Sequence, residues 1–213
     1  MSLVVCDITP EEVVFLADSA HPTENMKPED WPNDARKVFL SPDQRVGIGI
    51  AGSLPFPWAG TCSQPEGWIE NVLQTEPPGD LSSPGDVVQV LTRRIEGLGV
   101  GPYGNGGVVM VAGFAAGVPE IYDLWVQSKS ERDHQLQVQV RRPNVNPLCY
   151  GLLALWDEVL ALAGRNGKPV PPRAKKRRRF FKRVMESAIR NVRGQGDLRV
   201  SLPVVVARIP NNL

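Results

Sequence analysis

The stretch that decides the predicted fold is VVFLADS, residues 13–19. Its first five residues form a β-branched and aromatic run, which is typical of a strand. A short apolar run at residues 3–6 precedes it, and the residues between the two runs, 9–12, are Thr-Pro-Glu-Glu and favour a turn. We therefore expect the chain to begin with a β-hairpin whose second strand ends at Asp18.

Downstream segments repeat this pattern and then change to helical periodicity. Further strands are predicted at residues 37–40, 46–52, 108–114, 119–126, 136–141 and 198–209, the last of them interrupted by Pro203. Helices are predicted at residues 65–73, 83–98, 150–163 and 173–193. Hairpins and helices in separate groups favour α+β layers over the alternating βαβ order of a doubly wound sheet. We expect one domain that spans residues 1–213.

Composition argues against several classes of protein. Hydrophobic residues make up 42% of the 213 residues and charged residues 22%, which argues against wholesale disorder. The formal net charge of +1 argues against a globally basic nucleic-acid binder. The three cysteines form no zinc pattern and only two histidines are present, so we expect no metal site and no cofactor. The longest apolar run, residues 107–118, is shorter than the ~20 residues of a membrane helix, and no secretory signal is visible, so a cytoplasmic protein without membrane contact is expected.

The N-terminus offers a candidate nucleophile. Ser2 follows Met1, and a small second residue is what removal of the initiator methionine requires. A freed Ser2 would carry an α-amino group with a pKa near ~8 beside its own hydroxyl. Such an amine can act as a base toward that hydroxyl, so that nucleophile and base share one residue. The plain alternative is that any protein can begin with Met-Ser without using it.

Several motifs follow Ser2 in a fixed order. Asp18 ends the second predicted strand, RKVF begins the third at residues 36–39, and GIGIAGS follows at residues 47–53. This series resembles the proteasome β-subunit family, including the HslV and Anbu peptidases. The hairpin at residues 107–122 and the last helix and strand, residues 185–209, extend the resemblance over most of the chain. It implies an α+β, four-layer αββα sandwich of the N-terminal-nucleophile hydrolase type, with two antiparallel sheets between helix pairs.

The resemblance also implies roles for individual residues. Ser2 takes the place of the nucleophilic threonine, and Asp18 and Lys37 take the places of the carboxylate and the lysine beside it. The backbone N–H near Gly52 falls where the family places its oxyanion donor. A buried lysine held by Asp18 would favour the deprotonated hydroxyl and stabilise nearby negative charge. A purely structural ion pair is the alternative for Asp18 and Lys37.

Three departures from the family pattern bear on activity. Serine replaces threonine at position 2. Residues 144–147, Asn-Val-Asn-Pro, stand where the family has Gly-Ser-Gly, and residues 190–194 lack the Asp and Ser that orient the amino terminus. Two functions stay open: a proteasome-like peptidase or amidohydrolase that acts on peptide or amide substrates through Ser2, and a catalytically inactive proteasome-like scaffold subunit. The resemblance implies a homo-oligomeric ring, with an unfoldase as a candidate partner.

Two predicted helices concern binding partners. Residues 173–183 form a dense run of Lys and Arg, which indicates either contact with nucleic acid or an acidic partner, or a solvated or inter-subunit helix face paired with carboxylates. The net charge near zero favours the second interpretation. In residues 150–163, apolar positions cover more than the ~100° stripe of one core-facing side. The surplus should contact a second helix or a neighbouring subunit, with Trp156 as the candidate interface anchor.

Overall fold

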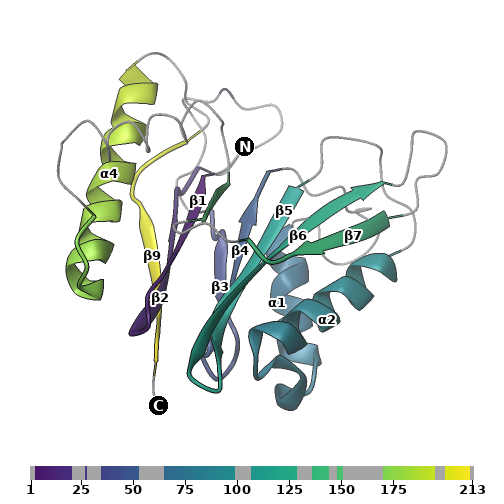
Figure 1. The fold of residues 1–213 in the computed structure, drawn as a ribbon. Coiled ribbons are helices and arrows are strands. Elements are labelled where there is room, and N and C mark those ends of the chain that lie inside the picture. The colour runs from purple at the N-terminus through teal and green to yellow at the C-terminus, as the bar shows by residue number, and fades with distance from the viewer. Residues whose placement is uncertain are drawn as a thin grey trace.

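Two antiparallel sheets lie face to face between outer layers of helix (Figure 1). The computed structural model describes residues 3–20, 27, 35–52, 65–98, 107–128, 136–143, 148–150, 170–194 and 200–211. Helix α4 covers one sheet, and helices α1 and α2 cover the other. The predicted αββα order of layers is therefore confirmed. No helix among the described residues is long and apolar enough to span a membrane.

The first sheet contains the N-terminal hairpin. Its strand order is β8-β1-β2-β9, with β1 (Val4–Ile8), β2 (Glu12–Ala17), β8 (Leu148–Tyr150) and β9 (Val205–Pro210). The register pairs Val4 with Ala17. In the turn, the Thr9 backbone N–H donates to the Glu12 carbonyl at 2.9 Å, and the Thr9 hydroxyl accepts from the Glu12 N–H at 3.0 Å. These turn contacts help to hold the register of the hairpin.

The second sheet packs closely against the first. Its strand order is β3-β4-β5-β6-β7, with β3 (Val38–Leu40), β4 (Val46–Ala51), β5 (Gly107–Ala115), β6 (Val118–Ser128) and β7 (Leu136–Arg141). Gly47 of β4 lies against Phe15 of the other sheet. A Cβ atom at Gly47 would lie 2.5 Å from Phe15 Cε2, so a side chain there would force the sheets apart. The glycine at position 47 therefore allows the two sheets to approach each other closely at this point.

The helices bury one face each. The outer layer on the second sheet comprises α1 (Pro65–Thr75), the short 3₁₀ helix η2 (Pro78–Leu81) and α2 (Pro84–Glu96). Ser83 caps α2, because its hydroxyl accepts the Asp86 backbone N–H at 3.2 Å. On the other side, α4 (Ala174–Gly194) packs Phe181 and Met185 into a cluster that includes Leu16. The sandwich therefore has one apolar cluster under each helix layer and a third between the sheets.

Two sequence predictions are corrected by the structure. Tyr150 was expected to begin a helix, but it is the last residue of strand β8, where it pairs with Val4. Backbone pairing and an inter-sheet hydrogen bond of its phenol hold it there, and a short apolar run does not by itself distinguish strand from helix. The last strand begins only at Val205, not at residue 198. The rest of the predicted helix 150–163, including Trp156, lies outside the described residues.

Candidate active site

Asp18 lies at the end of β2, directly beside the start of β1. Its backbone N–H donates to the Leu3 carbonyl at 3.0 Å, which continues the hairpin pairing by one step beyond the strands. The Leu3 N–H in turn donates to the Asp18 carboxylate oxygen Oδ1 at 2.6 Å. The carboxylate is therefore fixed against the residue that follows Ser2 in the chain. Ser2 itself lies outside the described residues.

Lys37 meets the other oxygen of the same carboxylate. It is the residue immediately before β3, and its Nζ lies 2.8 Å from Asp18 Oδ2. Asp18 Oδ2 also accepts the Ala20 backbone N–H at 3.0 Å. The side chains are 0% exposed for Asp18 and 5% exposed for Lys37. Burying two charges is costly unless they are paired and hydrogen-bonded, and Asp18 meets this condition with one cation and two backbone donors.

Gly52 lies at the same end of the second sheet as Lys37. The Lys37 carbonyl accepts the Ile50 N–H at 2.9 Å, and Gly52 follows two residues later, just beyond β4. The φ angle of Gly52 is 82°, in the left-handed region that suits glycine. Asp18, Lys37 and Gly52 thus lie at the ends of neighbouring strands in the two facing sheets. The role of each residue stays a prediction.

No protein-family model matches the sequence, and no curated protein does. Among solved structures, the chain is similar to Thiobacillus denitrificans BPH in complex with epoxomicin, with a TM-score of 0.56, 11% identity and coverage of 99% of this chain and 100% of that chain. It is also similar to eukaryotic HslV from Trypanosoma brucei, with a TM-score of 0.54, 16% identity and coverage of 98% and 99%. The chain has the fold of HslV.

This HslV-type fold confirms the predicted fold class and the family resemblance at the level of architecture. At 11% and 16% identity the likeness concerns the path of the chain and not the chemistry of individual positions. Arguments about residues must therefore come from the contacts of this chain. Among the described residues, no group of three or more His, Cys, Asp or Glu side chains could hold a metal ion.

Ser19 and Ser201 form a contact near the site that sequence reasoning missed. Their hydroxyl oxygens are 3.3 Å apart, and the Ser19 N–H donates to the Ser201 carbonyl at 3.3 Å. Both residues are buried. The contact joins the segment after β2 to the segment before β9, next to Asp18. The sequence carried no signal for it, because residues 198–204 were predicted to be strand.

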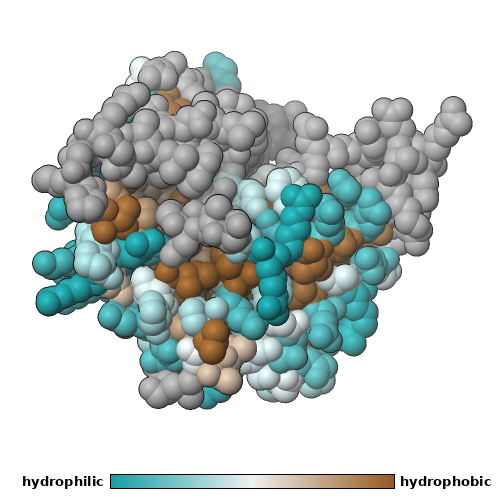
Figure 2. All heavy atoms as spheres, viewed as in Figure 1, coloured by the Kyte–Doolittle hydropathy of each residue, from teal (hydrophilic) through white to brown (hydrophobic). Residues whose placement is uncertain are grey.

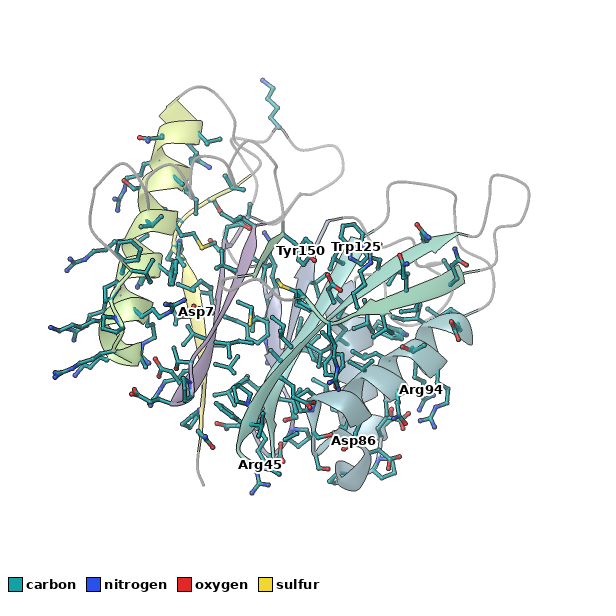
Figure 3. All side chains as sticks on the ribbon, in the orientation of Figure 1. Asp7, Arg45, Asp86, Arg94, Trp125 and Tyr150 are labelled. Carbon is teal, nitrogen blue, oxygen red and sulfur yellow. The ribbon has the colours of Figure 1, made fainter. Side chains whose placement is uncertain are left out.

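A second missed group bridges the two sheets on the other side of β1. Tyr150 of β8 donates its phenol hydroxyl to Asp123 Oδ2 of β6, and Trp125 Nε1 donates to the same oxygen at 3.2 Å. The rings of Trp125 and Tyr150 meet edge to face with centroids 5.5 Å apart (Figure 3). Burial, followed by the hydrogen bond to Asp123, raises the pKa of the Tyr150 phenol well above its usual range. Because Tyr150 pairs with Val4, this group braces the strand that leads from Ser2.

The end of α4 shows what replaces the expected relay residues. Residues 190–194 are Arg-Asn-Val-Arg-Gly and contain neither a carboxylate nor a hydroxyl. Arg193 Nη1 donates to the Val200 carbonyl at 3.0 Å, so it ties the helix end to the segment that carries Ser201. In this segment, which departs from the family pattern, Arg193 thus makes a structural contact.

The structure also has a cavity of about 530 Å³ in the outer helix layer. Its lining includes Trp68 of α1, and Arg93 and Arg94 of α2. Both arginines pair with the buried carboxylate of Glu76, Arg93 at 3.0 Å. Among the described lining residues, Asp18, Lys37 and Gly52 are absent, so the cavity is separate from the ion pair of Asp18 and Lys37.

Proposed function

We propose that this protein is a proteasome-like peptidase or amidohydrolase that uses Ser2 as its nucleophile after removal of Met1. The observation that carries the proposal is the buried ion pair of Asp18 and Lys37. Asp18 Oδ1 also accepts the backbone N–H of Leu3 at 2.6 Å. The carboxylate that pairs with Lys37 thus accepts the backbone N–H of the residue that follows the serine. The HslV-type fold supports the same activity class.

The proposed reaction needs the serine amine, its hydroxyl and a donor for negative charge. The Ser2 α-amine accepts the hydroxyl proton while Oγ attacks the substrate carbonyl carbon. The carbonyl oxygen becomes an oxyanion, which the N–H near Gly52 stabilises. The amine then returns the proton to the leaving nitrogen, and an ester to Ser2 remains. Water, deprotonated by the same amine, hydrolyses the ester and restores the serine.

Lys37 acts in this scheme through its charge. An ammonium group close to the Ser2 hydroxyl lowers the free energy of the alkoxide and of the oxyanion that follows. Asp18 is a positioning residue, because it holds Nζ of Lys37 with one oxygen and the Leu3 backbone with the other. The two oxygens of one carboxylate thus link the lysine to the backbone beside the nucleophile.

The second candidate function is an inactive scaffold subunit with the same fold. The specific observation in its favour is the sequence of residues 190–194, which offers no acid and no hydroxyl to orient a free amino terminus. In that case Asp18 and Lys37 serve only to hold the two sheets together. For either function we propose a cytoplasmic homo-oligomeric ring, and for the active form an unfoldase partner.

Two measurements separate these functions. Intact-mass spectrometry of the purified protein should show loss of Met1. A serine-reactive electrophile should then add one label, and the label should map to the N-terminal peptide. Ser2→Ala should abolish labelling, whereas Ser82→Ala, which removes an exposed serine before α2, should leave it unchanged. Quantitative retention of Met1, or labelling that survives Ser2→Ala, would overturn the proposed mechanism and leave the scaffold.

A further inference from the structure

Apart from Arg193 at its end, the basic residues of α4 fall into two groups with different surroundings. Arg177 and Arg178 point to the sheet and pair with buried carboxylates. Arg177 Nε lies 2.7 and 2.8 Å from the two oxygens of Asp7, and Arg178 Nη1 lies 2.6 Å from Glu12 Oε2. These two arginines anchor the helix to the β1–β2 hairpin. Their charges are compensated within the chain.

The second group forms a basic stripe on the outer face of the helix. The stripe consists of six exposed side chains, most of them three, four or seven residues apart, namely Lys175, Lys176, Arg179, Lys182, Arg183 and Arg190. Such spacings place them on one side of a helix, opposite the buried face that contains Phe181 and Met185. From Lys175 to Arg190 the stripe is about 22 Å long at 1.5 Å per residue. Nitrogen-tipped side chains extend outward from this helix in Figure 3, and Figure 2 shows hydrophilic atoms projecting at the same edge.

The stripe is almost uncompensated. Among the described residues, one contact with a carboxylate is present, between Lys182 and Glu186 at 3.8 Å. The other stripe residues make no ion pair within that part of the chain. The whole chain has a formal net charge of only +1, so the positive charge here is a local concentration and not a general property of the surface. Side chains of one sign in a row repel one another until a polyanion neutralises them.

We propose that the basic stripe of α4 binds the phosphate backbone of duplex DNA. Phosphates follow each other every 3.4 Å along each strand, so a stripe of about 22 Å spans about six base-pair steps. Arginine presents a planar fork of donors that matches phosphate oxygens, and lysine acts on phosphate as a point charge. Contacts to phosphates carry no sequence information, so binding through the phosphate backbone is independent of DNA sequence. This function would attach the protein to DNA and lies beyond the proposed hydrolase activity.

Other polyanions fit the stripe less well. Single strands are bound through aromatic side chains on which bases stack, but Phe180 is half-buried and packs edge to face on Phe181 in the cluster beneath the helix. An amphipathic helix that lies in a membrane surface buries apolar side chains beside its charges, and the stripe positions are all Lys or Arg. Recognition of duplex RNA relies on contacts to 2′-hydroxyls in addition to phosphates. A second copy that used the same stripe would oppose like charges.

The test is fluorescence anisotropy of the full chain with a labelled DNA duplex of about 20 base pairs over a salt series. With six phosphate contacts and a slope of about −0.9 per contact, affinity should fall about 1,800-fold between about 50 and 200 mM salt. In the variant Lys175→Gln/Arg179→Gln/Arg183→Gln, about three contacts remain and the fall should be about 40-fold. Affinity at about 50 mM salt should also drop for this variant.

The matched control removes the same number of charges elsewhere. Arg45, Arg141 and Arg142 are exposed, and Arg45→Gln/Arg141→Gln/Arg142→Gln should keep the wild-type salt slope. Equal slopes for the two triple variants would overturn the proposal, as would no binding at about 50 mM salt. Equal or tighter binding of polyglutamate, of anionic vesicles or of duplex RNA would overturn it in favour of those partners. A loss of self-association in the stripe variant alone would show that the stripe is an interface between copies.

Discussion

At the scale of single residues, the carboxylate of Asp18 links the segments that lead into β1 and β3, which belong to different sheets. One oxygen accepts the backbone N–H of Leu3, the residue just before β1, and the other accepts Lys37 from the segment just before β3 of the facing sheet. A glutamate would place these oxygens one carbon further away, and an asparagine would replace one acceptor by a donor. The site thus requires a short, ionised and doubly accepting side chain at this position.

Asp18→Asn tests this requirement directly. The amide leaves Lys37 buried without its counter-ion, and its NH₂ group faces either Lys37 or a backbone N–H. Breaking a buried ion pair in this way costs about 3–5 kcal/mol, and we expect a loss of that size in the free energy of unfolding from urea titration. The double variant Asp18→Asn/Lys37→Met should recover part of the loss, because no unpaired charge remains buried. A loss below about 1 kcal/mol for the single variant would show that the pair is not a structural centre.

At the scale of elements, local patterns in the sequence identified the strands and helices whose partners are close in the chain. Apolar and β-branched runs with turn residues between them located the β1–β2 hairpin, and the helix start at Ser83 located α2. Tyr150 was assigned to a helix because its strand character depends on Val4 and Asp123, which are distant in the sequence. The ion pair of Asp18 and Lys37 was expected from the family resemblance, whereas nothing in the sequence indicated Ser201.

The attachment of α4 to the hairpin gives a prediction about pH. Burial raises the pKa of Asp7 from its ordinary value, although the hydrogen bond and the charge of Arg177 oppose the shift. A carboxyl with a raised pKa binds its proton more tightly in the folded than in the unfolded state. The contribution of Asp7 to stability therefore falls as pH rises from about 4 through its folded pKa.

We expect the stability of wild type minus that of Asp7→Asn to decrease over this pH range in urea titrations. Titration of the other carboxylates cancels in the difference, which isolates Asp7. Glu11→Gln removes an exposed carboxylate from the same hairpin and controls for the loss of one negative charge. A difference that increases with pH would mean that the attraction of Arg177 outweighs burial.

At the scale of the whole molecule, the candidate active site and the basic stripe of α4 lie in different layers. The candidate nucleophile region lies at the end of the two facing sheets, whereas the basic stripe lies on the outer face of α4. Substitutions in the stripe should therefore leave the ion pair of Asp18 and Lys37 intact. The proposed hydrolase activity and the proposed DNA binding can be tested in the same preparation without interference.

The last prediction concerns assembly into a homo-oligomeric ring. A peptidase with an exposed serine nucleophile would cleave proteins without selection, and a closed ring restricts access to the site. Rings form when a head-to-tail interface repeats with a rotation that closes. Sedimentation velocity at micromolar concentration should therefore give a mass several times the 23.4 kDa of one chain. Trp156→Ala should lower that mass if the segment 150–163 lies at the subunit contact, whereas Trp68→Ala in the outer helix layer should not. A clean monomer across this concentration range would refute the ring and, with it, a secluded chamber for hydrolysis.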